Sequence, residues 1–136
     1  MTVQVELVVP DGEVWSGNAR MVIAKTLDGD IGIMGSHPAV LGILAEGSLV
    51  EILDPEEGSS TQGSPMRVAV RSGFLSVHDD RVSILAREAE LGSQVDRAAV
   101  QSRLDAALGE AGSGGDEESA EVKYSRALLR AAGDGS

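Results

Sequence analysis

The residues best suited to chemistry in this sequence are two histidines with hydroxyl or carboxyl groups beside them. Ser36 and His37 are adjacent and could be imagined as a nucleophile and its base, and His78 is followed by Asp79 and Asp80. An activated nucleophile needs a base and a third orienting group in a fixed spatial arrangement, which adjacency does not supply. We therefore expect His37 to be a structural or contact residue and residues 78–80 to form a polar hairpin tip. A small hydrolase remains as an alternative.

Metal and phosphate sites are also poorly supported. Asp28 and Asp30 flank Gly29 as at the start of a calcium loop, but the later acidic ligands are missing. A phosphate-binding loop ends in Gly-Lys-Ser/Thr, and no lysine lies in residues 29–44. Cysteine is absent, which excludes thiolate metal sites and disulfides. We predict no catalytic residue, no metal and no cofactor.

The most informative stretch is residues 29–44, which read GDIGIMGSHPAVLGIL. Glycine recurs at every third position from Gly29 to Gly35, with apolar side chains between. Glycine reaches backbone conformations that other residues disfavour and lets neighbouring chain pass close by. The pattern predicts a short strand at residues 31–34 within a tightly turned loop on a β scaffold. Such a stretch is a shaped contact surface rather than a chemical site.

Size and composition limit the remaining possibilities. With 136 residues, the chain allows one modest domain, alone or with a small appendage. A net charge of −11 and an aromatic content of 2% argue against binding to nucleic acid. The first residues lack the basic and apolar regions of a secretory signal, and no apolar run approaches the roughly 20 residues of a membrane-spanning helix. We expect a cytosolic protein that does not insert into the membrane.

The first two thirds of the chain have the pattern of strands. Val3, Val5 and Leu7 alternate with Gln4 and Glu6, which is typical of a half-buried strand. Turn-forming residues recur every 8–12 positions, so residues 1–88 are predicted to form an all-β sandwich or barrel, of which we favour the sandwich. The expected strands are residues 3–9, 13–16, 19–27, 31–34, 48–53, 66–71, 74–77 and 81–86, and residues 40–44 form a further apolar segment. A turn is expected at residues 16–18, a turn or bulge at 72–73, and an exposed connection at 54–65.

Residues 89–136 are rich in alanine, glutamate, leucine and arginine, which favour helices. We predict a small α-helical hairpin with helices at residues 95–108 and 120–132 and a flexible break at 109–119. Ser93 and Ser119 are the expected N-caps, and Asp96 lies near the positive end of the first helix. Both helices are short and alanine-rich, so we expect a weakly packed hairpin or one that lies on a partner.

Three basic residues of the second helix, Lys123, Arg126 and Arg130, share one face because of their spacing. Val122 and Leu129 share another face. The basic face is open to two interpretations, a solvated helix surface or a contact with an acidic partner.

Two stretches together, residues 29–44 and SGFLSVHDDRVSILAREAE at residues 72–90, resemble the epsilon subunit of bacterial F-type ATP synthases. The plan of a sandwich followed by a helical hairpin is also similar. The resemblance implies a non-catalytic rotor subunit of the central stalk, which couples proton-driven rotation of the c-subunit ring to ATP synthesis. It implies contacts with the gamma subunit, the c ring and the alpha and beta subunits, where ATP chemistry occurs. The implied location is the cytoplasmic face of the cell membrane, as a peripheral protein.

The resemblance also implies particular contact residues. Asp30 falls at the acidic position that faces the polar loops of the c ring, and His37 falls at the loop histidine near gamma and the ring. Ile31 and Met34 belong to the same implied contact. The family usually has Pro-Gly-His-Ala-Pro where this chain has Gly-Ser-His-Pro-Ala at residues 35–39. The shifted proline implies a different local turn.

For the hairpin, the resemblance implies a restraint on ATP hydrolysis through basic helix residues that meet an acidic beta-subunit segment. Only Lys123, Arg126 and Arg130 match this role, in a segment with more acids than bases, so we expect weak or modified inhibition. Some members bind ATP through the pattern Leu/Ile-Asp-x-x-Arg-Ala. Here Asp96 is kept as a possible vestige of that site, but Ala99 replaces the arginine, so we expect no ATP binding. The alternative from another class is a free-standing β-sandwich binding module with a helical dimerisation arm.

Overall fold

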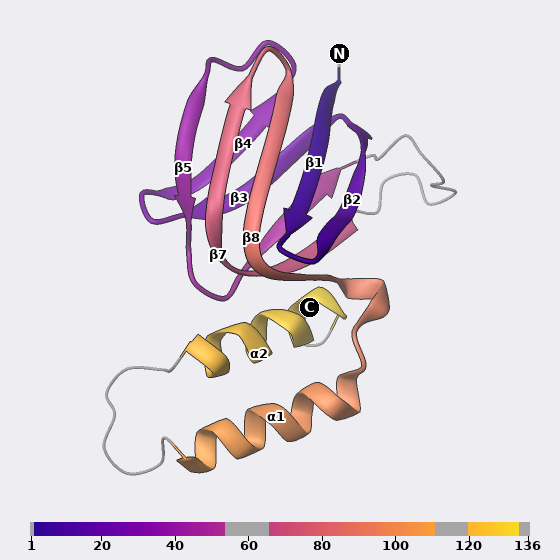
Figure 1. The fold of residues 1–136 in the computed structure, drawn as a ribbon, viewed down its shortest axis with the longest axis vertical. Helices are drawn as coiled ribbons and strands as arrows, with labels where there is room; N and C mark the ends of the chain where they lie inside the picture. The colour runs from indigo at the N-terminus through magenta and orange to yellow at the C-terminus, as the bar shows by residue number, and fades with distance from the viewer. Residues whose placement is uncertain (1, 54–65, 111–119, 134–136) are drawn as a thin grey trace.

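Strands from the first two thirds of the chain form two layers, and two helices lie against one end of them (Figure 1). The computed structural model describes residues 2–53, 66–110 and 120–133. The predicted fold, a β-sandwich followed by a helical hairpin, is confirmed. The connection expected at residues 54–65 and most of the break expected at 109–119 lie outside the described residues.

The elements follow the predicted order, with longer strands at the end of the sandwich. The strands are β1 (Val3–Val9), β2 (Gly12–Ala19), β3 (Met21–Thr26), β4 (Gly29–Met34), β5 (Val40–Leu44), β6 (Ser48–Leu53), β7 (Met66–His78) and β8 (Arg81–Leu91). A 3-10 turn, η1 (Gly92–Gln94), leads to the helices α1 (Arg97–Glu110) and α2 (Ala120–Ala131). β8 thus continues five residues beyond the expected end at Ala86, since its last residues pair with the first half of β7.

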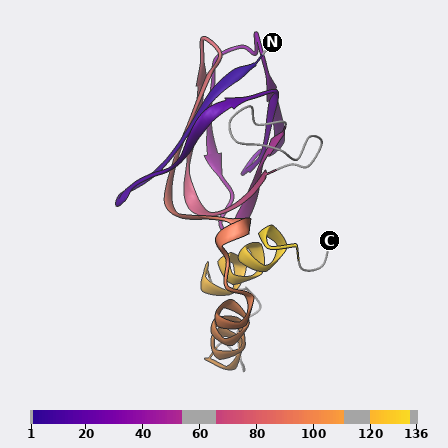
Figure 2. The ribbon, with the colours of Figure 1, turned by 90° about the vertical axis from the view of Figure 1, so that its right-hand side faces the viewer.

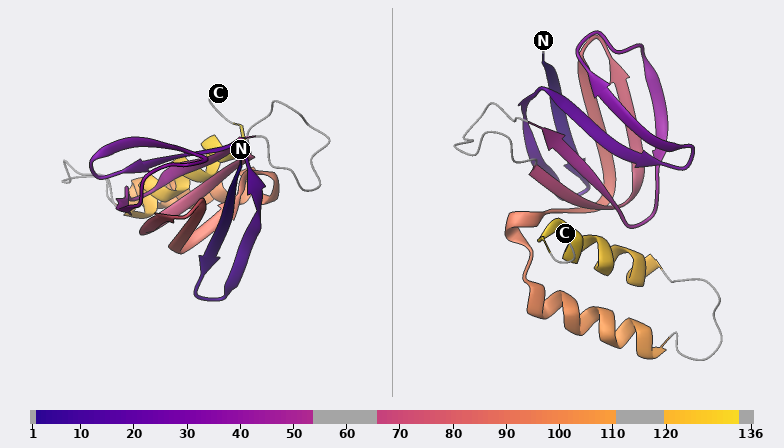
Figure 3. Two further views of the ribbon diagram at one scale, coloured as in Figure 1. Left: turned by 90° about the horizontal axis from the view of Figure 1, so that it is seen from above. Right: turned by 180° about the vertical axis from the view of Figure 1, so that it is seen from behind.

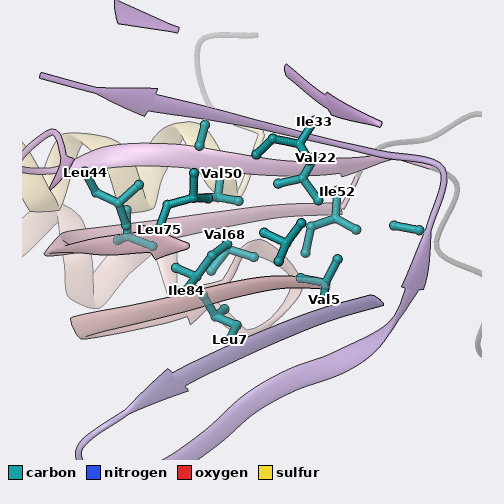
Figure 4. Packing of buried hydrophobic residues seen from close by; sticks show 14 of the residues in the cluster. Val5, Leu7, Val22, Ile33, Leu44, Val50, Ile52, Val68, Leu75 and Ile84 are labelled. Atoms are coloured by element: carbon teal, nitrogen blue, oxygen red, sulfur yellow. The ribbon is translucent and has the colours of Figure 1, made fainter. Parts of the chain in front are cut away.

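The strands are arranged in the order β2-β1-β8-β7-β5-β3-β4, with β6 paired to both β3 and β7. β1 and β8 run parallel, whereas β7 pairs antiparallel with β5, β6 and β8. The alternation in β1 is reproduced, because Val3, Val5 and Leu7 are fully buried. Branched aliphatic side chains from both layers fill the core between the sheets (Figure 4). These include Ile33, Ile52, Leu75 and Ile84.

β7 joins the two layers by bending. The predicted interruption at residues 72–73 does not end the strand but kinks it, with positive φ angles of 45° at Ser72 and 153° at Gly73. A Cβ atom on Gly73 would lie 2.1 Å from the carbonyl oxygen of Leu85, so this position requires glycine. Before the kink β7 pairs with β6, and after it β7 pairs with β5.

The turn predicted at residues 16–18 is wrong. Ser16, Gly17 and Asn18 lie inside β2 and pair with β1, which satisfies the backbone groups that a turn would otherwise leave open. Gly17 serves packing instead of turning, because a Cβ atom there would lie 2.9 Å from the ring of Trp15. The β1–β2 hairpin projects from the rest of the sandwich, as the view from above shows (Figure 3).

The N-cap predicted for the first helix is also wrong. Ser93 lies in η1, and α1 begins at Arg97, where the backbone N–H of Ala99 donates to Asp96 Oδ1 at 3.1 Å. Asp96 is therefore the N-cap, because its carboxylate satisfies an N–H that the first helical turn leaves open. The second predicted cap, Ser119, lies outside the described residues.

α2 lies between the sandwich and α1 (Figures 1 and 2). On one side Tyr124, Ala127 and Leu128 pack with Ala69 of β7. On the other side Val122 packs with Leu104 of α1. Burial on both sides stabilises a helix that would be marginal alone. None of the helices in the described part of the chain is long and apolar enough to span a membrane.

Candidate functional site

The predicted contact residues on β4 divide between its two faces. Asp30 and Met34 are exposed, as alternate residues of one strand face should be. Ile31 is half-buried and packs against the sandwich core. The strand therefore presents a carboxylate and a thioether outward, while Ile31 and Ile33 anchor it from behind.

His37 lies in the loop between β4 and β5. Its ring Nδ1–H donates to the carbonyl oxygen of Pro38 at 2.7 Å, and its backbone N–H donates to the carbonyl of Met34 at 3.2 Å. Ser36 adopts a positive φ of 67°, and its backbone N–H donates to Asp80 Oδ1 at 2.6 Å. These interactions fix the shape of a loop.

The second histidine occupies a polar hairpin tip, as predicted. His78 Nδ1 lies 3.3 Å from Asp79 Oδ2, with side-chain exposures of 75% and 83%. Asp79 and Asp80 both adopt positive φ angles, 50° and 61°, as a two-residue hairpin turn requires. Within the described residues, no three His, Asp or Glu side chains gather as a metal site.

An apolar stripe, which the sequence analysis did not identify, crosses the outer face of the sandwich. Ile43 of β5 pairs with Phe74 of β7, and Phe74 pairs with Leu85 of β8. Leu41 lies two residues from Ile43 on the same face. The exposed fractions of these four residues are 74% for Leu41, 51% for Ile43, 54% for Phe74 and 55% for Leu85. We call Leu41, Ile43, Phe74 and Leu85 the apolar stripe.

Neighbouring strands align these side chains, so the apolar stripe is a continuous feature of the β5, β7 and β8 layer in the foreground of Figure 1. Contiguous exposed apolar surface marks sites of protein interaction. The signal in the sequence was that these strands carry apolar residues on both faces, for example at both Phe74 and Leu75. A strand with only one buried face should be polar on the other.

Asp30 shares a groove with the hairpin. A cavity of about 240 Å³ is lined by side chains of both signs from β3, β4, β6 and α2, among them Lys25, Asp30, Glu51 and Arg130. Lys25 is the direct cross-strand partner of Asp30. The structure thus brings the predicted ring-contact acid and one residue of the basic helix face to a single groove.

The basic face of α2 is exposed. Lys123, Arg126 and Arg130 all point outward, while Val122 and Leu129 pack toward α1. The predicted division of α2 into faces is therefore confirmed.

One carboxylate, Glu121 of α2, connects three elements. Its Oε1 accepts from Arg103 of α1, at 3.0 Å from Nε and 2.8 Å from Nη2. Its Oε2 accepts from Arg71 Nη1 of β7 at 3.3 Å. Arg71 also lies 3.6 Å from the carboxylates of Glu46 and Glu88. We call the Arg71–Glu121–Arg103 set the clasp, because it connects the sandwich, α2 and α1.

Sequence reasoning missed the clasp because its members are far apart in the chain, with Arg71 and Glu121 separated by 50 positions. Tyr124 lies beside it, with the Arg71 guanidinium 6.0 Å from the ring centre. Burial, reinforced by Glu88 and Glu90, raises the pKa of the Tyr124 phenol to about 12. Burial also raises the pKa of Glu90, and the Arg103 charge opposes that shift. Tyr124 is therefore neutral at physiological pH.

Comparison with known proteins gives the family. The family model described as the beta-sandwich domain of the ATP synthase Delta/Epsilon chain matches residues 2–92. An ATP synthase epsilon chain from Thermobifida fusca is 47% identical over 133 residues, which cover 94% of this chain and 90% of the relative. One from Streptomyces coelicolor is 38% identical over 126 residues, covering 93% and 95%. Each relative is named as one chain of ATP synthase.

Two solved assemblies contain chains of the same fold. One is the Euglena gracilis mitochondrial ATP synthase, with a TM-score of 0.67 and 19% identity over 94% of this chain and 75% of that chain. The other is the central stalk and c ring of the Tetrahymena thermophila mitochondrial ATP synthase, with a TM-score of 0.57 and 20% identity over 97% and 91%. At these identities the similarity concerns the fold alone. The family model and the bacterial relatives, which agree with the resemblance found in the sequence, show that this chain belongs to the ATP synthase epsilon-chain family.

Proposed function

We propose that this chain is a non-catalytic rotor subunit in the central stalk of an F-type ATP synthase. It would bind the gamma subunit and the c ring and couple their rotation to ATP synthesis at the alpha and beta subunits. It would be held at the cytoplasmic face of the cell membrane by these contacts alone. Family membership supports this function, and so do the solved assemblies of the same fold, which contain a c ring.

The observation that carries the proposal is the apolar stripe. Phe74 and Leu41 are half or more exposed, so in the isolated chain their apolar surface is largely in contact with water. Covering that surface with a partner is favourable because it removes the apolar area from water. We assign the stripe to the gamma subunit. A rotor subunit must transmit torque without slipping, and an apolar contact, unlike an exposed ion pair, is not screened by salt.

We assign the polar edge of β4 and the loop that follows it to the ring. Asp30 and Met34 point outward, and His37 sits in a loop held by hydrogen bonds. Ile31 would support this surface from the core side. An exposed ion pair between Asp30 and a basic ring side chain contributes about 1 kcal/mol or less. It would therefore orient the chain on the ring more than it would strengthen the binding.

The test of the gamma contact uses membranes stripped of their own epsilon chain. The purified chain is added back, and its binding and ATP-driven proton pumping are measured. The double variant Phe74→Ser with Leu85→Ser should bind at least tenfold more weakly, because two buried apolar contacts are lost. Leu108→Ser is the matched control, since Leu108 is 41% exposed on α1, away from the stripe. Equal binding of both variants would refute the assignment to gamma.

The ring contact has its own test in the same membranes. Asp30→Lys should lower the number of protons pumped per ATP, because the charge facing the ring is reversed. Asp105→Lys makes the same charge change on the exposed surface of α1 and should leave pumping unchanged. If Asp30→Lys left the number of protons pumped per ATP unchanged, Asp30 would not be part of the ring contact.

We propose a division of labour between the parts, with residues 1–88 making the rotor contacts and residues 89–136 regulating hydrolysis. Lys123, Arg126 and Arg130 are exposed on one face of α2. Replacing all three with glutamine should raise the ATP hydrolysis rate of the assembled enzyme if they restrain it.

Asp96 acts as a helix cap. A calorimetric titration of the chain with ATP should accordingly give no heat of binding. If the chain instead purified from cells without gamma, alpha and beta, the free-standing module would be the better interpretation.

A further inference from the structure

Backbone strain is concentrated at the end of the sandwich farthest from the helices. Among the described residues, positive φ angles outside glycine occur at Ser36, Ser72, Asp79 and Asp80, and three of the four meet where the β4–β5 loop approaches the β7–β8 hairpin. Figure 1 places both connections at the end opposite α1 and α2. Side chains disfavour this conformation, so it persists only where the surroundings enforce it, and such residues gather at functional sites.

A hydrogen bond joins the two strained segments. The backbone N–H of Ser36 donates to Asp80 Oδ1 at 2.6 Å. A carboxylate acceptor makes this bond short and stronger than a bond between neutral groups. It links positions 44 residues apart, and it connects the two stretches on which the family resemblance rests.

Asp80 is itself held rigidly. Its carbonyl accepts the backbone N–H of Gln4 at 2.8 Å, which attaches the hairpin tip to β1. On either side, His78 and Arg81 are paired across the β7–β8 ladder. The carboxylate is therefore presented from a fixed position to the β4–β5 loop.

The loop geometry depends on Ser36. The N–H of His37 donates to the carbonyl of Met34, which closes a tight turn around Ser36. If Ser36 left its positive φ, the direction of His37 and the end of β4 at Met34 would change together. The Asp80 carboxylate is thus connected through Ser36 to the turn that joins Met34 and His37.

We propose that Asp80 is a positioning residue that pre-organises the β4–β5 loop for docking on the polar loops of the ring. This inference rests on the proposed ring contact of Met34 and His37. Asp79 does not share the role, because its side chain is 83% exposed and pairs with His78 in the same hairpin tip. Pre-organisation raises affinity because the loop need not be ordered on binding.

The test compares two glycine variants of one turn. Asp80→Gly and Asp79→Gly each remove one negative charge, and glycine accepts the positive φ that both positions require. In the isolated full-length chain, Asp80→Gly should speed amide hydrogen exchange at Ser36 about tenfold, as expected for the loss of a charged hydrogen bond. Asp79→Gly should leave that exchange unchanged. Asp80→Asn keeps an acceptor oxygen and should restore most of the protection.

The second measurement is binding to epsilon-stripped membranes. Asp80→Gly should bind several-fold more weakly, with Asp79→Gly and Asp80→Asn close to the unmodified chain. Unchanged exchange at Ser36 in Asp80→Gly would overturn the inference and leave the proposed function intact. Faster exchange with unchanged binding would also overturn it. The proposed ring contact itself is judged separately, by Asp30→Lys, so the two failures are distinguishable.

Discussion

Replacing Glu121 with glutamine should weaken the docking of the hairpin on the sandwich without unfolding the sandwich. The substitution keeps the size of the side chain and removes the charge that Arg71 and Arg103 share. The side chains of the three residues are 22% exposed for Arg71, 34% for Glu121 and 44% for Arg103. Partly exposed ion pairs contribute up to about 1 kcal/mol each, so two pairs give a loss of about 1–2 kcal/mol in docking free energy.

The chain carries its own reporters for this measurement. Trp15, its single tryptophan, packs against the sandwich core, and Tyr124, its single tyrosine, is buried at the base of α2. Denaturation followed by tyrosine signal should shift to lower denaturant in Glu121→Gln, while the tryptophan transition stays in place. A double-mutant cycle with Arg103→Gln should give a coupling energy of about 1 kcal/mol.

Asp105→Asn is the control, because it removes the same charge from an exposed site on α1. The chain has a net charge of −11, so removing any acid relieves general repulsion and should stabilise slightly. The two variants should therefore change the docking free energy in opposite directions. If Glu121→Gln stabilised the hairpin as Asp105→Asn does, the clasp would be a surface contact of no energetic consequence.

Three further predictions concern packing and pH. Leu128→Ala removes a fully buried side chain and should lower the docking free energy of α2 by about 2–5 kcal/mol, seen as faster amide exchange in α2 but not in β1. Gly73→Ala should lower the unfolding free energy of the sandwich by more than about 2 kcal/mol, measured by tryptophan fluorescence, since its Cβ would collide with the Leu85 carbonyl. The pKa of Tyr124 rises from 10.0 to about 12 on folding. The contribution of this shift to the free energy of unfolding is therefore fully present below pH 10 and should be lost between pH 10 and pH 12. The absorbance of tyrosinate follows this step, and Tyr124→Phe should abolish it.

Periodicity predicted most of the sandwich because local pattern and burial agree there. Val3, Val5 and Leu7 alternate in sequence and are all buried, so the pattern alone predicted the inward face of β1. The helical spacing of residues in α2 likewise predicted its basic and apolar faces. The local pattern failed at residues 16–18, where Ser-Gly-Asn is typical of a turn but the ladder with β1 keeps the segment extended. Here long-range pairing overrode local propensity.

Features that depend on distant partners were not visible in the sequence. Glycine at position 73 indicated an interruption, but only the carbonyl of Leu85 explains why the strand bends rather than ends. Asp96 was noted for its charge near the helix start, yet its role as N-cap follows from the later start of α1. The contact of Ser36 with Asp80 spans 44 residues, so no local pattern predicts it.

The energetics of α2 limit which partners could draw the hairpin away from the sandwich. Leaving the sandwich would expose Tyr124 and Leu128, and burial of each such side chain is worth about 1.5–3 kcal/mol. The clasp adds about 1–2 kcal/mol. The three residues of the basic face are already exposed in the docked state and can gain only about 1 kcal/mol or less for each new exposed pair. Charge attraction alone is therefore too weak to draw the hairpin away from the sandwich, and a partner that did so must also cover the apolar face that the sandwich now buries.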